Sequence, residues 1–460
     1  MYSVPQTLFK QYSASLLSRV KLVAFLLGLF IVLYVLIHTK ILRVSLGNQE
    51  VQLVGTANVS VTNASDLTKF PFGTTDAFGR LRTSEPYTMF DSSFRFADNG
   101  LWVTSTSGTT AVSWDSGSMT LTVDGTSGSK VYRETTKVFA YQPGKSFLIL
   151  CTMAFATPTA NLRQRAGYFG STNGIYLEQD GTTLYLVRKS ESLGTTLRVP
   201  QTEWNAATFV TSPRALDISK TNIFWMDIEW LGVGDVRTGF IVDGSFVLAH
   251  TFHNDNVNLK PYMTTASLPL RIELENTGTT GVSSTFRHIC NTVISEGGYA
   301  LHGTQISIGT PVTTARTSSG TAGTFIPVVA LQLKAAKLDA IVIPTSLSLI
   351  GLGNNVTWKY ELRANSTVTG GSWTEVSADS AVEYNSGGTA VSGGRILASG
   401  YLRSDAQGTT VFTILKEGLF RNQLERNSFT NTPFTLSLCM ACSTTSQSCF
   451  ASIDWEEVTR

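Results

Sequence analysis

The sequence predicts an all-β protein that is tethered by a single N-terminal transmembrane helix. Short apolar and β-branched runs, separated by turn residues, recur from about residue 90 to the C-terminus, and no segment after residue 50 keeps a helical periodicity. Charged residues make up 15% of the 460-residue chain, which is below the roughly 25% of an average globular protein. One uninterrupted apolar segment, Leu22–Ile37, stands apart near the N-terminus.

This apolar segment is predicted to cross a membrane. Between Lys21 and Lys40, whose side chains can reach the headgroups, the stretch is long enough to span a hydrocarbon core of about 30 Å. A cleaved signal peptide is the alternative, but the following HTKILRVSLG offers no good small-x-small site, which favours an uncleaved anchor. More basic residues precede the span than follow it, which favours the N-terminus inside and the β domains outside. The anchor side chains that we single out are Leu22, Phe25, Leu27, Phe30, Leu33 and Ile37.

The remaining chain divides by composition into further segments. Residues 1–21 form a short tail, 22–40 the anchor, 41–69 a polar, β-branched stalk, 70–300 a large β-sandwich and 301–460 a second, smaller β-sandwich. In the large block, GIYLEQDGTTLYLVRKS predicts a hairpin that turns near Asp180 and Gly181. Repeated strands over about 200 residues favour a two-sheet jelly roll.

Charge and motif content exclude several classes of partner. The formal net charge is +2 and no basic stripe is present, so nucleic acid is not an expected partner. No phosphate-binding loop and no nucleophile–histidine–carboxylate arrangement can be assigned, and no cofactor is predicted.

The stretch FWMDIEW carries two carboxylates in a predicted strand. Because alternate residues of a strand share a face, Trp225, Asp227 and Glu229 should point one way, and Phe224, Met226, Ile228 and Trp230 should form the core face. We therefore single out Trp225, Asp227 and Glu229 as candidate glycan-facing residues.

This stretch resembles the catalytic strand of laminarinase- and lichenase-type β-glucanases, which are concanavalin-like jelly rolls. Their motif is E-x-D-x-E or E-x-D-x-x-E, and the resemblance implies a nucleophile at the first Glu and an acid/base at the last. Here Trp225 occupies the nucleophile position, and an indole cannot form a glycosyl–enzyme intermediate. The spacing of Asp227 and Glu229 alone would still permit an inverting pair, but we expect the strand to be non-catalytic.

Three residues near the end of another predicted strand could bind a metal. His250, His253 and Asp255 offer two imidazoles and a carboxylate. Residues i and i+3 of a strand face opposite sides, so they would converge only if the strand ends between them. A surface histidine beside a capped turn is the favoured alternative.

The cysteines allow more than one interpretation. Cys439 and Cys442 form a C-x-x-C pair, but a structural zinc site needs four ligands and no fourth is nearby. A cross-strand disulfide between Cys442 and Cys449 and a set of unpaired thiols both remain open.

Four long stretches resemble segments of structural proteins of tailed phages and large DNA viruses. They are DAFGRLRTSEPYTMFDSS (Asp76–Ser93), GYFGSTNGIYLEQDGTTLYLVRKS (Gly167–Ser190), DIEWLGVGDVRTGFIVDG (Asp227–Gly244) and HICNTVISEGGYALHG (His288–Gly303). The resemblance covers roughly Phe70–Gly303 and implies a virion setting, with capsid or other virion proteins as partners. The resemblance implies no catalytic residues. An oligomer also stays open, because the alternating segment before Phe70 could form a trimeric β-stalk.

Three functions follow in order of preference. The first is a membrane-anchored, non-catalytic structural protein of a virion, a minor capsid or spike component, located in a viral or host membrane. The second is a glycan-binding attachment protein, and the third is a carbohydrate-active hydrolase.

Overall fold

The computed structural model describes residues 43–46, 49–54, 58–63, 85–210, 215–229, 231–300, 302–404, 409–414 and 423–459. The described residues form β-strands, with two short 3-10 turns, Gln201–Glu203 and Ala335–Lys337, as their helical elements. Within this part of the chain, no helix has the length and apolar character needed to span a bilayer. The expected anchor, residues 22–40, lies outside the described residues.

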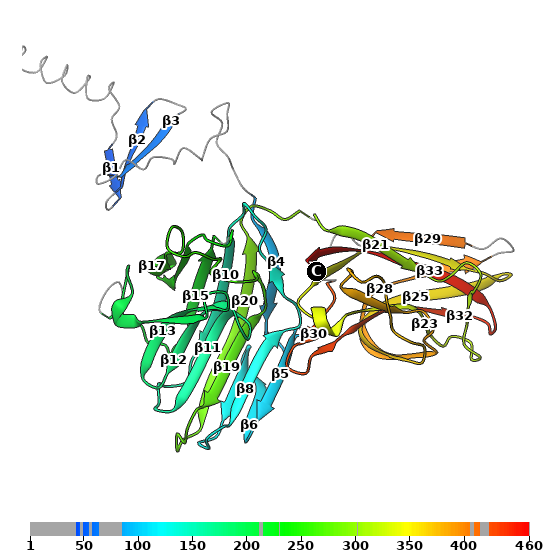
Figure 1. Cartoon of the computed structure of the whole chain (residues 1–460), viewed down its shortest axis with the longest axis horizontal. Coiled ribbons are helices and arrows are strands. Elements are labelled where there is room, and N and C mark those ends of the chain that lie inside the picture. Colours follow the sequence, from blue (N-terminus) through cyan, green and yellow to red (C-terminus); the bar gives the residue numbers. More distant parts are fainter. Residues whose placement is uncertain are drawn as a thin grey trace, which may run out of the picture. The chain divides into compact units, whose positions relative to one another are not determined.

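The chain separates into two compact units, Met1–Thr83 and Ser84–Arg460. In the first unit, β1 (Arg43–Leu46), β2 (Gln49–Val54) and β3 (Asn58–Asn63) pair in that order as an antiparallel sheet (Figure 1). The segment that the sequence suggested as an extended stalk therefore contains a three-stranded meander.

The second unit begins with a sandwich of two antiparallel sheets, drawn from cyan to green in Figure 1. The eight-stranded sheet has the order β17-β16-β15-β10-β20-β7-β6, and β4 also pairs with β20. Its strands are β4 (Tyr87–Ser93), β6 (Thr110–Asp115), β7 (Ser118–Val123), β10 (Phe147–Ala154), β15 (Asn222–Ile228), β16 (Val236–Val242), β17 (Ser245–Phe252) and β20 (Ser284–Ser295).

The seven-stranded sheet has the order β14-β13-β12-β11-β19-β8-β5. Its strands are β5 (Trp102–Ser107), β8 (Lys130–Thr135), β11 (Leu162–Phe169), β12 (Gly174–Asp180), β13 (Thr183–Ser190), β14 (Thr195–Pro200) and β19 (Leu270–Asn276). A small pair, β9 (Phe139–Ala140) with β18 (Ser267–Leu268), lies outside both sheets. The chain passes repeatedly from one sheet to the other, as in a jelly roll.

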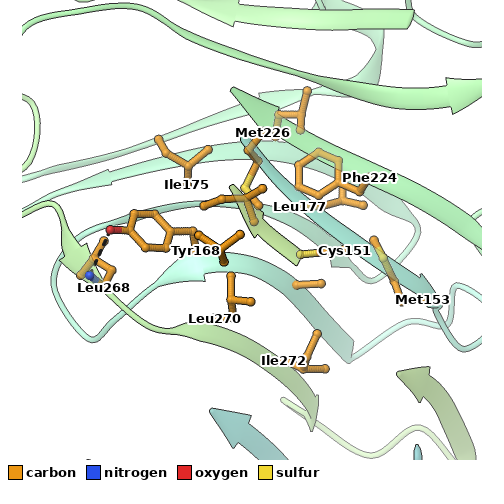
Figure 2. Packing of buried hydrophobic residues seen from close by; sticks show 14 of the residues in the cluster. Cys151, Met153, Tyr168, Ile175, Leu177, Phe224, Met226, Leu268, Leu270 and Ile272 are labelled. Atoms are coloured by element: carbon orange, nitrogen blue, oxygen red, sulfur yellow. Dashed lines mark hydrogen bonds between the residues drawn. The ribbon is translucent and has the colours of Figure 1, made fainter. Parts of the chain in front are cut away.

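The core of this sandwich follows from strand alternation. Phe224 and Met226 of β15 meet side chains of the facing sheet, among them Leu177, as Figure 2 shows. All three are fully or almost fully buried. The Tyr168 hydroxyl accepts a hydrogen bond from the Leu268 amide (3.1 Å), which Figure 2 draws as a dashed line. It also donates to the Phe139 carbonyl (2.6 Å). Its hydrogen bonds compensate for burying an O–H in apolar surroundings.

A second, smaller sandwich follows, drawn from yellow-green to red in Figure 1. Its five-stranded sheet holds β21 (Thr304–Gly309), β22 (Arg316–Thr317), β24 (Ile341–Gly351), β29 (Thr409–Ile414) and β33 (Ser448–Thr459). Its six-stranded sheet holds β23 (Ile326–Leu333), β25 (Val356–Thr369), β26 (Thr374–Glu375), β27 (Val382–Asn385), β28 (Ala390–Ser404) and β32 (Thr435–Cys442). Trp358 and Trp455 are the largest side chains in the core between them.

The two sandwiches contact each other through a hairpin of the second, β30 (Arg426–Asn427) with β31 (Thr432–Pro433). The Arg426 guanidinium reaches Glu134 and donates to the Thr135 carbonyl (2.7 Å), and its backbone amide donates to the Thr136 carbonyl (2.9 Å). Both sandwiches accordingly belong to one compact unit.

The suggested disulfide between Cys442 and Cys449 is not formed, and all five cysteines are free. Cys442 ends β32 and Cys449 lies in β33, so the two residues belong to different sheets rather than to one ladder. Both thiols are buried in the core of the second sandwich.

Candidate functional site

Strand β15 places the predicted residues on the two faces that alternation requires. Phe224, Met226 and Ile228 lie in the core of the first sandwich, whereas Asp227 lies on the outer face. Glu229 follows the strand and is exposed, and Trp230 lies outside the described residues.

The end of β15 lies in a row of strand ends across the eight-stranded sheet. Ile228 pairs with Phe147 on one side and with Val236 on the other, and Val236 pairs with Phe252. The loops that follow these ends therefore gather at one edge of the sandwich.

A pocket of about 540 Å³ opens among these loops, and we call it the sheet-end pocket. Its wall combines carboxylates, cations, hydroxyls and a glycine backbone, so that it offers both hydrogen-bond donors and acceptors. Its lining residues are Tyr141, Gly144, Lys145, Ser146, Asp227, Glu229, Leu231, Asp235, Arg237 and Thr251.

Two carboxylates of the pocket have different environments. Asp227 forms an ion pair with Arg237, its partner across the β15–β16 ladder. Burial raises the pKa of Asp227, and the Arg237 charge opposes that rise. Among the described residues, Glu229 forms no ion pair, so its carboxylate can accept hydrogen bonds from a ligand.

Trp225 is not available as an open stacking surface. Its side chain is only 6% exposed and packs beside Phe246, with ring centroids 5.6 Å apart. A Cβ atom at Gly239 would lie 2.7 Å from the indole, so the glycine makes room for the ring. Of the three candidate glycan-facing residues, Asp227 and Glu229 line the pocket and Trp225 lies outside its lining.

The structure does not bring together all three residues that the sequence suggested as metal ligands, His250, His253 and Asp255. His250 is buried in β17, where its Nδ1 accepts the Asn205 amide (3.2 Å), and burial lowers its pKa to about 4. It is therefore not part of the group, because the strand directs it away from His253. His253 and Asp255 instead meet Asp235, and their ligand atoms lie within 4.8 Å of one another.

The new member of this group, Asp235, already binds its neighbours. Its carboxylate lies 2.7 Å from His253 Nδ1 and accepts the Asn254 amide at 3.0 Å. One imidazole and two carboxylates suit a divalent cation, but the same groups form an ordinary ion pair. No sequence pattern singled out Asp235, because it comes from a different loop.

The outer face of the seven-stranded sheet carries a set of acids that the sequence did not reveal. Glu178 of β12 is buried between Arg165 and Arg198, with Arg198 Nε at 2.7 Å, and Arg165 also lies 3.0 Å from Glu273. The available signal was the spacing of Glu178 and Asp180, which equals that of Asp227 and Glu229. Since these charges satisfy one another, this face fits a structural network better than a ligand site.

No protein-family model and no curated protein matches the chain. Among solved structures, the chain is similar to a Bacillus licheniformis β-glucanase, with 14% identity and a TM-score of 0.31, over 46% of this chain and 99% of that one. It is similar to the carbohydrate recognition domain of Emp47p, with 11% identity and a TM-score of 0.32, over 48% and 99%. For the CBM2 module of an evolved Dit protein of Lactobacillus casei BL23 phage J-1, the values are 6%, 0.34, 48% and 100%. With TM-scores and identities this low, these likenesses assign no ligand or activity to this chain.

Proposed function

We propose that this chain is a membrane-anchored, non-catalytic structural protein of a virus particle, and that its first sandwich binds carbohydrate in the sheet-end pocket. The observation that carries the binding role is the polar lining of that pocket. Asp227 is already paired with Arg237, whereas Glu229 makes no ion pair among the described residues. A hydroxyl-rich ligand, which both donates and accepts hydrogen bonds, suits such a mixed lining better than a simple ion does.

The arrangement favours binding over hydrolysis. A retaining glycosidase needs two carboxyl groups about 5–5.5 Å apart, one of them free to attack. The nucleophile position of the β-glucanase motif holds Trp225, and Asp227 is engaged by Arg237. Glu229, which follows β15, then has no free carboxylate partner on that strand.

The virion setting rests on the four stretches that resemble viral structural proteins, and the membrane anchor rests on the apolar segment 22–40. Mass spectrometry of gradient-purified particles from the source virus, with and without mild detergent, tests both. The chain should be present in particles and released by detergent. Its absence from particles, together with its presence in infected or host membranes, would overturn the structural role.

The binding role is tested with the full chain in nanodiscs against a panel of oligosaccharides. Asp227→Asn and Glu229→Gln should each weaken binding by about tenfold or more, because each replaces one acceptor oxygen by an NH2 donor and removes the negative charge. Asp115→Asn is the matched control, since Asp115 also pairs with an arginine, Arg287 at 2.8 Å, on the same sheet. If the wild-type chain released sugar and Glu229→Gln abolished that release, the non-catalytic proposal would be wrong.

A further inference from the structure

Two loops beside the sheet-end pocket expose aliphatic side chains to solvent. One loop connects β15 to β16, and the other follows β17. Their exposed residues, which we call the apolar tip, are Leu231 (53% exposed), Val233 (45%), Val257 (67%) and Leu259 (103%). Single exposed aliphatic residues are common on protein surfaces, but four on two adjacent loops are not explained in that way.

The two loops are fastened to each other, so the exposure belongs to the fold. The Tyr262 amide donates to the Gly232 carbonyl at 3.0 Å, and the Asn254 side chain donates to the Gly234 carbonyl at 2.9 Å. Asn254 is itself fully buried. Leu231 has a φ of 37°, a backbone conformation that is costly for a residue with a side chain. The loop thus accepts strain while an apolar side chain stays in water.

The apolar tip lies at the end of the first sandwich where the chain enters it. The row of strand ends next to the tip continues across the sheet from Phe147 to Ser295 and then to Tyr87. Tyr87 begins β4, close to the first described residue of this unit. Residues 41–84, which precede it, connect the sandwich to the predicted anchor.

We propose that the apolar tip contacts the surface of a lipid bilayer, the membrane that holds the anchor. This inference rests on the anchor of the proposed function. The tip contains only four aliphatic residues, whereas a stable protein interface needs about 800 Å² from each partner. A bilayer contact can be much weaker, because the anchor keeps the sandwich near the membrane at a high effective concentration. Lys260, next to Leu259 and also exposed, can reach the phosphate groups.

The experiment uses the full chain in proteoliposomes, with an environment-sensitive fluorophore on Leu259→Cys. Val282→Cys is the matched control, because Val282 is 55% exposed but precedes β20 at the opposite end of the sandwich. The wild-type chain, treated with the same fluorophore, measures the signal from label on the native cysteines, and this signal is subtracted. We expect the label at 259 to shift to the blue and to be quenched by brominated lipids several-fold more than the label at 282.

Each other outcome overturns the proposal. Equal, water-like spectra at both positions would show that the tip stays in solvent. A blue shift at 259 without quenching by brominated lipids would show a protein partner, and dependence on protein density would identify a second copy. Carbonate extraction of the same proteoliposomes tests the anchor separately. A chain that is extracted would refute the anchor, whatever the label reports.

Discussion

Arg426 of the second sandwich lies 2.8 Å from Glu134 of the first, and both side chains are only 2% exposed. The same guanidinium donates to the Thr135 carbonyl, and it also pairs with Asp339. Each charge also has a partner in its own sandwich, Arg271 for Glu134 at 3.5 Å and Asp339 for Arg426 at 3.2 Å. The buried pair therefore adds stability across the contact between the sandwiches without being the sole compensation for either charge.

Replacing Arg426 should therefore destabilise the whole second unit. Arg426→Ala removes the nearer of the two cations of Glu134 and leaves Arg271, at 3.5 Å, as the other, so it should lower the free energy of unfolding by about 3 kcal/mol, the low end for breaking a buried pair. Arg287→Ala is the control: Arg287 and its partner Asp115 are 44% and 48% exposed, and the loss of this pair should cost about 0–1 kcal/mol. Urea unfolding measures both. Equal losses for the two variants would contradict a special role for the contact between the sandwiches.

Two buried histidines predict a loss of stability on acidification. Burial lowers the pKa of His250 to about 4 and that of His288 to about 3. The folded state therefore favours neutral imidazoles, and the unfolded chain binds more protons once the pH falls below about 6.5. Their contribution is complete above that pH and is lost as the pH falls toward the folded values. Between pH 7 and 5 the loss should be about 2 kcal/mol for each histidine.

Urea midpoints at several pH values between 7 and 5 measure this slope. His250→Asn keeps an acceptor for the Asn205 amide, because the Asn oxygen can replace Nδ1. This variant should lose about half of the pH dependence. A wild-type chain with equal stability at pH 7 and pH 5 would show that the imidazoles do not control it.

Alternation along single strands could be predicted from the sequence, and the structure agrees where the strand is regular. Phe224, Met226 and Ile228 form the core face of β15 because a strand directs every second side chain to one side. The all-β class follows from the same local signal. The pairing of β1, β2 and β3 into a meander could not be predicted, because polar β-branched runs do not specify which strands pair or in what register.

The composition of the site could not be predicted, because it depends on contacts between distant segments. Asp235 joins His253 only after two loops come together, and no spacing encodes that contact. Trp225 was expected on an open face, but Gly239 on the neighbouring strand has no side chain, and the indole packs into that space and is buried. Likewise, Cys442 and Cys449 are close in sequence but belong to different sheets.

The cysteines should all be recovered as free thiols. Cys151, Cys439 and Cys449 are buried, and burial raises the pKa of each to about 12, so the reactive thiolate is scarce in the folded protein. Cys290 is only partly buried and should react first. Alkylation followed by mass spectrometry should modify few sites in the native chain, but all five after unfolding without reductant. A crosslinked peptide pair containing Cys442 and Cys449 would refute this prediction.

The packing of Trp225 against Gly239 gives a direct test of the outer face of β15. In Gly239→Ala the added methyl would lie 2.1 Å from the Val247 carbonyl oxygen and 2.7 Å from the indole, so the ring or the strand must move. Such overpacking costs about 1–3 kcal/mol. Gly320→Ala is the control, since a Cβ atom there meets nothing within 4 Å. Urea unfolding and tryptophan fluorescence should both change in the first variant only. Because Asp227 lies next to Trp225 on the same face, Gly239→Ala should also weaken oligosaccharide binding at the sheet-end pocket, and unchanged binding would show that the pocket is independent of Trp225.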